Sequence, residues 1–192
     1  MQNHPADQEP RRVLGSFFAP KSQNTPTWEQ RKLGDLCVEF RSGEFISASD
    51  ITETGEYPVF GGNGLRGFTD RFNHDGEYTL IGRQGALCGN VNFAVGKSYF
   101  TEHAIAVRAD KKNQTRFLYY LFSTMDLGQY SGQSAQPGLA VGNLVELKST
   151  LSDKQEQEKI SGVLTALDTL ITLHQREHIK PILEVKRVKR NE

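Results

Sequence analysis

The sequence predicts an α+β fold: an irregular, curved, mixed β-sheet domain with a few helices, followed by one long C-terminal helix. Two observations support this prediction. Between residues 54 and 108, short stretches of alternating apolar and polar residues are interrupted by glycines, which is typical of short strands joined by tight turns and bulges. From residue 152 to about residue 178, apolar residues instead recur at spacings of three and four, as in an amphipathic helix.

The chain before the domain is polar and rich in proline. Residues 1–27 are therefore predicted to be a linker, or the end of a preceding helix. The domain itself is predicted to span residues 28–151. Residues 27–37 suggest a short helix that Thr27 caps, and a strand that turns at Ser42-Gly43 should follow.

One segment inside the domain has clear helical periodicity. It is TRFLYYLFSTMDL, residues 115–127, and Phe117, Leu118 and Phe122 should face inward with Leu121. A polar, amide-rich loop follows at residues 131–139. The β-branched and apolar residues of NLVELKST, residues 143–150, then predict the last strand of the domain.

The long helix is predicted over residues 152–180. Ser152 and Gln155 form a capping-box pattern at its start, and Pro181 is expected to end it and to leave a basic tail at residues 181–192. Its apolar stripe either packs on the domain or pairs with another helix, as in a short coiled coil. The predicted dimerisation residues on this stripe are Ile160, Val163, Leu164, Leu167, Leu170, Ile171 and His174.

Composition narrows the class of protein. The 192 residues suit one domain with an appendage, or two small domains, and 36% hydrophobic residues are typical of a soluble globular protein. No apolar run approaches the roughly 20 residues that span a bilayer, and the N-terminus lacks the apolar core of a signal peptide. We therefore expect a cytoplasmic protein without a membrane segment. Since 23 basic and 23 acidic residues cancel, any nucleic-acid surface must come from local placement of charge.

The glycine-rich segments match no nucleotide-binding motif. Neither GGNGLRG nor IGRQGALCG is a Walker A loop or a dinucleotide fingerprint, so the glycines are predicted to serve turns and close strand crossings. Arg66 and Arg83 lie within these segments. Each arginine fits a structural ion pair, and each fits a contact to a phosphate or a guanine edge equally well.

No catalytic or metal motif is present either. Cys37 and Cys88 are predicted to be buried thiols, because their spacing suggests neither a zinc site nor a disulfide framework. His174 and His178 have the spacing of half a metal site, but the polar end of a helical stripe explains them better, so no metal is predicted. Acid–base chemistry would have to depend on the adjacent pair Glu102-His103, which has no evident nucleophile beside it.

Four segments in order resemble the specificity subunit of type I restriction–modification enzymes. They are TWEQRKLGDLC, YPVFGGNGLRGF, YTLIGRQGALCGNV and EQEKISGVLTALDTLITLHQRE, and the resemblance covers about residues 28–178. It implies a target-recognition domain followed by a conserved helix. In this family two such repeats pair their helices antiparallel as a spacer, and each domain reads one half of a split DNA sequence.

The resemblance also implies the partners. The specificity subunit has no catalytic residues and no cofactor of its own; it directs methyltransferase subunits, which methylate adenine with S-adenosylmethionine, and motor-endonuclease subunits. This chain resembles one C-terminal-type repeat, half a subunit. Two copies paired through their helices would place two domains at a fixed separation, so we predict a homodimer that recognises a symmetric split site in double-stranded DNA. The alternatives are a protein-interaction module that binds no DNA, and an enzyme of unknown type that uses Glu102 and His103.

Base-reading residues are expected in loops. Arginine suits guanine edges, and asparagine or glutamine suits adenine edges, in the major groove. The predicted DNA-binding residues are Arg41, Asn63, Arg66, Arg71, Arg83, Gln84, Gln133 and Gln136.

Overall fold

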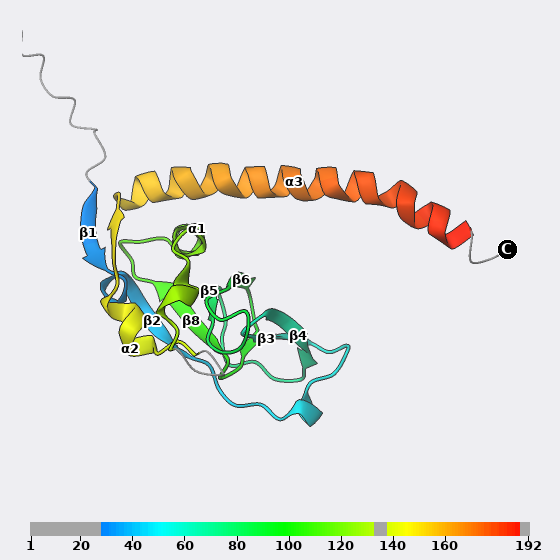
Figure 1. The fold of residues 1–192 in the computed structure, drawn as a ribbon, viewed down its shortest axis with the longest axis horizontal. Coiled ribbons are helices and arrows are strands. Elements are labelled where there is room, and N and C mark those ends of the chain that lie inside the picture. The colour runs from blue at the N-terminus through cyan, green and yellow to red at the C-terminus, as the bar shows by residue number, and fades with distance from the viewer. Residues whose placement is uncertain (1–27, 133–137, 189–192) are drawn as a thin grey trace, which may run out of the picture.

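The computed structural model describes residues 28–132 and 138–188, with the side chains of that second range described as far as residue 177. In these residues the chain forms a mixed α+β domain from which a long helix extends (Figure 1). The strands are β1 (Glu29–Lys32), β2 (Cys37–Ser42), β3 (Tyr57–Gly61), β4 (Gly64–Thr69), β5 (Glu77–Gly82), β6 (Val91–Val95), β7 (Tyr99–Phe100), β8 (Ala104–Ala109) and β9 (Lys148–Leu151). The helices are α1 (Thr115–Ser123), α2 (Val141–Glu146) and α3 (Lys154–Val188), with short 3₁₀ turns η1 (Gly34–Leu36), η2 (Ala48–Asp50) and η3 (Leu127–Tyr130).

The strands form small sheets that confirm the predicted irregular, mixed architecture. The central sheet has the order β2-β8-β5-β6, a second sheet has the order β4-β3-β7, and β1 pairs with β9. The pairing of β3 with β7 is parallel, whereas the others are antiparallel. Register shifts in β2 and β3 bend both sheets, as β-bulges do.

The main core lies between the central sheet and the helices. Helix α1 packs on β5, β6 and β8, and its Phe117, Leu118 and Phe122 are buried against Ile81 and Ile105 of the sheet. The predicted helix at residues 115–127 is therefore confirmed, although it ends at Ser123. Its apolar face buries large side chains, which is the main source of its stability.

Strand β1 corrects the prediction of a short helix at residues 27–37. These residues form a strand followed by the single turn η1, because Glu29–Lys32 pairs with β9 in the register Glu29↔Leu151 to Lys32↔Lys148. Weak local helical propensity lost to long-range strand pairing. The predicted strand at residues 143–150 is only partly right, since α2 occupies Val141–Glu146 and β9 begins at Lys148.

Helix α3 also differs from the prediction at both ends. Asp153, not Ser152, caps it: the Asp153 Oδ1 accepts a hydrogen bond from the Glu156 backbone N–H at 3.0 Å, so the N-cap lies one residue later than predicted. The helix continues through Pro181 to Val188, so the predicted end at Pro181 is wrong. A proline within a helix removes one backbone hydrogen bond and favours a bend, and α3 curves toward its C-terminal end in Figure 1.

The pairing of β1 with β9 sets where the domain and α3 meet. It brings the start of the domain beside the start of α3, at the end of the molecule where both leave the sheets (Figure 1). Within the described ranges, none of the helices has the length and apolar character needed to cross a membrane.

Candidate nucleic-acid interface

Three of the predicted DNA-binding residues come together around one hollow. Asn63 lies in the turn between β3 and β4, Arg66 lies on β4, and Gln84 lies in the loop after β5. Together with Gly62, Gly85 and His103 they line a cavity of about 360 Å³ that opens to solvent; we call this cavity the hollow. Asn63 and Arg66 belong to one hairpin, and only the fold brings Gln84 and His103 next to them.

Glycines allow these loops to approach one another. A Cβ on Gly62 would lie 2.9 Å from the His103 carbonyl oxygen, and a Cβ on Gly82 would lie 2.2 Å from the Gly62 carbonyl oxygen. A Cβ on Gly61 would lie 2.5 Å from Cδ of Arg66, so the stem of that arginine covers Gly61. The glycine-rich motif is thus structural, as predicted, and it places the Arg66 side chain at the hollow.

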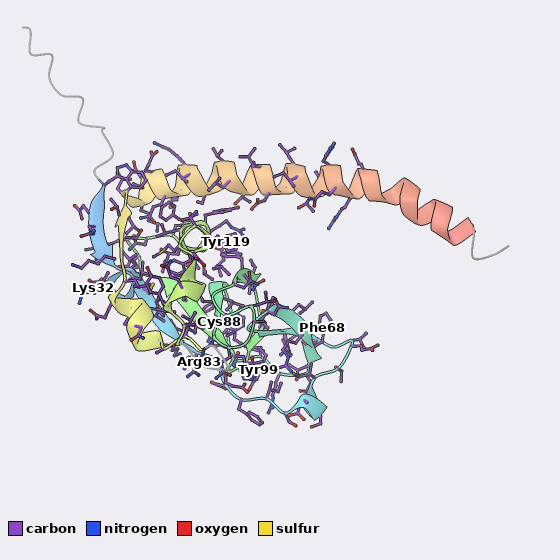
Figure 2. All side chains as sticks on the ribbon, viewed as in Figure 1. Lys32, Phe68, Arg83, Cys88, Tyr99 and Tyr119 are labelled. Carbon is purple, nitrogen blue, oxygen red and sulfur yellow. The ribbon has the colours of Figure 1, made fainter. Side chains whose placement is uncertain are left out.

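The backbone of Arg83 joins three loops beside the hollow. Its N–H donates to the His103 carbonyl at 2.9 Å, and its carbonyl accepts from the Leu139 N–H at 2.8 Å. Gln84 also forms an isolated antiparallel bridge with Gly138. Gly138 and Leu139 therefore lie next to these loops, whereas the predicted Gln133 and Gln136 lie outside the described residues. Figure 2 shows Arg83 on the side of the domain away from α3.

Arg41 and Arg71 do not join this group. The Arg41 Nε donates to Glu39 Oε1 at 2.7 Å, and the Arg71 Nη2 donates to Asp50 Oδ2 at 3.0 Å. The Arg71 guanidinium also lies over the ring of Tyr99, 5.6 Å from its centroid. Both arginines are more than half exposed, but neither lines the hollow, and each has an intramolecular partner.

Glu39 is the centre of a polar cluster at the sheet. Its Oε1 also lies 3.0 Å from His74 Nε2, and its Oε2 accepts from the Tyr78 hydroxyl at 3.0 Å. Burial raises the pKa of the Glu39 carboxyl, but the hydrogen bonds from Arg41, Tyr78 and His74 outweigh burial and lower that pKa below its ordinary value. Arg41 therefore belongs to this cluster, which supports a structural role for it.

The pair Glu102-His103 sits at the edge of the hollow. Glu102 Oε1 lies 3.3 Å from His103 Nε2, and Glu102 Oε2 is buried without a hydrogen-bond partner in the described part of the chain. In that same part, no group of three or more histidine, cysteine, aspartate and glutamate side chains is placed to hold a metal ion. Among the residues that the structure describes, no observation favours the enzyme alternative.

The cysteines differ in one respect from the prediction. Neither forms a disulfide, but each is partly buried and not fully buried. The Cys37 thiol donates to the Leu33 carbonyl at 3.3 Å, and burial raises its pKa to about 12. Burial also raises the pKa of the Cys88 thiol. Both thiols are therefore poor nucleophiles at neutral pH, since the thiolate is the reactive form.

Helix α3 docks on its own domain through polar side chains. Gln157 is fully buried: its Oε1 accepts from the Gln114 N–H at 3.0 Å, and its Nε2 donates to Asn113 Oδ1 and to the Ser152 carbonyl, both at 2.9 Å. Ser161 hydrogen bonds to the Gln114 side chain. One helical turn later the Tyr120 hydroxyl contacts Thr165 and Asp168, and Figure 2 shows the neighbouring Tyr119 beneath α3.

Most of the predicted stripe lies on a different side of α3. Ile160 packs at the edge of the core and Leu164 is partly buried, but Val163, Leu167, Leu170 and Ile171 are between 48% and 62% exposed. His174 is exposed as well. We call these exposed residues, Val163, Leu167, Leu170, Ile171 and His174, the outer face. The structure therefore excludes the alternative in which the whole stripe packs on the domain.

Comparison with known proteins places these features in a family. A family model described as "Type I restriction modification DNA specificity domain" matches residues 26–183. The chain is similar to the type I restriction enzyme EcoprrI specificity subunit of Escherichia coli, with 43% identity over 165 residues, which is 84% of this chain and 39% of that protein.

Solved structures share the fold. The S subunit of the type I restriction–modification system from M. genitalium superposes with a TM-score of 0.68 and 22% identity, over 78% of this chain and 41% of that chain. A chain from a structure on complex assembly and conformational transition of the type I R-M system gives a TM-score of 0.63 and 18% identity, over 88% of this chain and 45% of that chain.

The chain therefore spans about two fifths of the length of the proteins it resembles. The family model nevertheless covers most of its residues, from before β1 into the C-terminal part of α3. On this evidence the chain belongs to the family of type I restriction modification DNA specificity domains.

Proposed function

We propose that this chain recognises a DNA sequence as one repeat of a type I restriction–modification specificity subunit, and that the hollow is part of its reading surface. The observation that carries the proposal is the convergence of Asn63, Arg66 and Gln84 in a chain of this family. Arginine offers a bidentate contact to guanine, and the two amides offer bidentate contacts to adenine. These side chains come together because the β3–β4 hairpin, which carries Asn63 and Arg66, meets the loop after β5, which carries Gln84.

The net charge of the chain supports recognition of DNA sequence through local contacts. The chain has a formal net charge of zero, so phosphate attraction spread over the whole surface contributes little to its affinity. Base-edge contacts carry sequence information, whereas phosphate contacts mainly position a protein on the duplex. A neutral chain with a concentrated set of base-reading side chains therefore fits a specificity unit better than it fits a general DNA-binding protein.

We further propose that two copies pair through the outer face of α3. Four aliphatic side chains on one side of a 35-residue helix are each about half exposed or more, and a partner helix would remove them from water. A two-fold pairing would set two domains at a fixed distance, on a symmetric split site.

In this proposal catalysis belongs to partners. The chain itself would be non-catalytic and would hold no cofactor; methyltransferase subunits would bring S-adenosylmethionine and methylate adenine, and motor-endonuclease subunits would cleave. Family membership supports these partners, and the presence of a similar chain in a structure on assembly of the type I R-M system supports them further. The cytoplasm, where bacterial DNA is accessible, is the proposed location.

Selection of duplex DNA from a randomised pool tests the reading function. The purified chain is incubated with the pool at moderate salt, and the bound DNA is sequenced. We expect a motif of two inverted half-sites at one fixed spacing. A chain that retains no DNA, or retains it without sequence preference, would contradict the proposal and favour a protein-interaction module. Reconstitution with the cognate methyltransferase, followed by mapping of methylated adenines, then tests whether the same motif is used.

A further inference from the structure

The turn between β7 and β8 contributes one residue to the hollow. This residue is not among the predicted DNA-binding residues. His103 lines the hollow beside Asn63, Arg66 and Gln84, and its imidazole is about two fifths exposed. Its backbone is held on both sides: the N–H donates to Thr101 Oγ1 at 3.3 Å, and the carbonyl accepts from the Arg83 N–H at 2.9 Å. The imidazole is therefore carried by a fixed turn next to the other base-reading candidates.

Glu102 lies beside this imidazole. Its Oε1 is 3.3 Å from His103 Nε2, so the carboxylate places a negative charge next to one ring nitrogen. The other carboxylate oxygen is buried and lacks a hydrogen-bond partner among the residues that the structure describes. An unpaired buried oxygen is unfavourable, so the position of this carboxylate requires an explanation beyond its own stability.

We propose that His103 is a further specificity-determining residue that contacts a base edge, and that Glu102 is its positioning residue. This inference rests on the proposed function. The carboxylate also decides between the two kinds of DNA contact. A negative group 3.3 Å from the imidazole repels a phosphate, whereas a base edge is neutral and offers both donors and acceptors to an imidazole. Among the side chains that line the hollow, Arg66 is the cation, and it suits a contact to a phosphate or to a guanine.

The same selection from randomised duplex DNA tests this assignment with variants. We expect His103→Ala to lose discrimination at one base pair in each half-site by about fivefold to a hundredfold, with the other positions unchanged. Glu102→Gln keeps the size of the side chain but removes its charge, so it should reduce discrimination at the same base pair by a smaller factor. Lys112→Ala, an exposed lysine that does not line the hollow, is the matched control and should select the wild-type motif.

The outcomes separate this inference from the proposed function. If the wild-type chain selects no motif, the proposed function fails. If the wild type selects a motif and His103→Ala selects it with equal discrimination at every position, the proposed function stands and the assignment of His103 is overturned. An equal loss at all positions in His103→Ala, in the milder His103→Asn and in Glu102→Gln would indicate a structural role and would also overturn it. Thermal unfolding of each variant by circular dichroism shows whether the fold is retained.

Discussion

The two sides of α3 differ in how they are used. The side that faces the domain packs Ile160 at the edge of the core and makes directed hydrogen bonds through Gln157, Ser161 and Asp168. The outer face is apolar and exposed, with Leu167 and Leu170 among its residues. A helix that only covered its own domain would turn its apolar side inward. The contrast indicates that hydrogen bonds help to fix the angle at which α3 leaves the domain, and it supports the proposal that the outer face contacts a partner.

The largest expected effect comes from the outer face. Leu167→Glu with Leu170→Glu places charges in the proposed dimer contact, where each leucine would contribute about 1.5–3 kcal/mol on full burial. Across two copies this predicts a dissociation constant raised by at least about a thousandfold, with the domain still folded. Sedimentation velocity over a dilution series measures the change.

The matched control adds the same charge on another side of the helix. Gly162 is exposed and has open space around its α-carbon, so Gly162→Glu should leave the dimer intact. A wild-type chain that stays monomeric at micromolar concentration would contradict the pairing, as would a double variant that dimerises like the wild type.

Substitutions on the side of α3 that faces the domain should change the stability of the fold and not the association of two copies. Gln157→Ala removes the three hydrogen bonds of this side chain, which involve Asn113 Oδ1, the Ser152 carbonyl and the Gln114 N–H. We expect a loss of about 2–4 kcal/mol in the free energy of unfolding, measured by urea denaturation. The exposed Gln155 is the control, and Gln155→Ala should change that free energy by less than about 0.5 kcal/mol. Equal losses in the two variants would remove the distinction between the sides.

A third test compares the hollow with the arginines that lie outside it. Arg66→Ala should weaken binding to the selected DNA motif by about 1–3 kcal/mol, because it removes a contact to a base or phosphate. Arg71→Ala removes the ion pair with Asp50 and should change DNA binding little. Fluorescence anisotropy with labelled duplex measures both affinities, and an equal loss in both variants would refute the special role of the hollow.

The smallest expected effect concerns the pH dependence of the Glu39 cluster. Because the pKa of Glu39 is lowered in the folded state, its ionised form stabilises the fold above the ordinary carboxyl pKa of about 4.3. That contribution is lost as the pH falls through the lowered value. Wild type should therefore exceed Glu39→Gln in unfolding free energy by about 1–2 kcal/mol at pH 7, with the difference shrinking below about pH 4. A difference that is constant with pH would contradict this role.

The sequence anticipated elements that depend on local pattern and missed those that depend on distant partners. Helix α1 was predicted because its apolar spacing lies within nine residues. The pairing of β1 with β9 joins Glu29 to Leu151, and no local signal marks such a pairing. Similarly, Asn63, Arg66 and Gln84 were each proposed singly, but their convergence depends on loop contacts. His103 was singled out for acid–base chemistry, and only the shared hollow links it to the others.

The apolar stripe of α3 was determined by the sequence alone, because helical periodicity is a property of neighbouring residues. Only the tertiary structure decided which side of that helix faces the domain. The deciding partners, Asn113, Gln114 and Tyr120, lie more than 40 residues away along the chain, where periodicity carries no information. The same holds for the hollow: residue type predicted a capacity to read bases, and three-dimensional contact decided which residues can do so together.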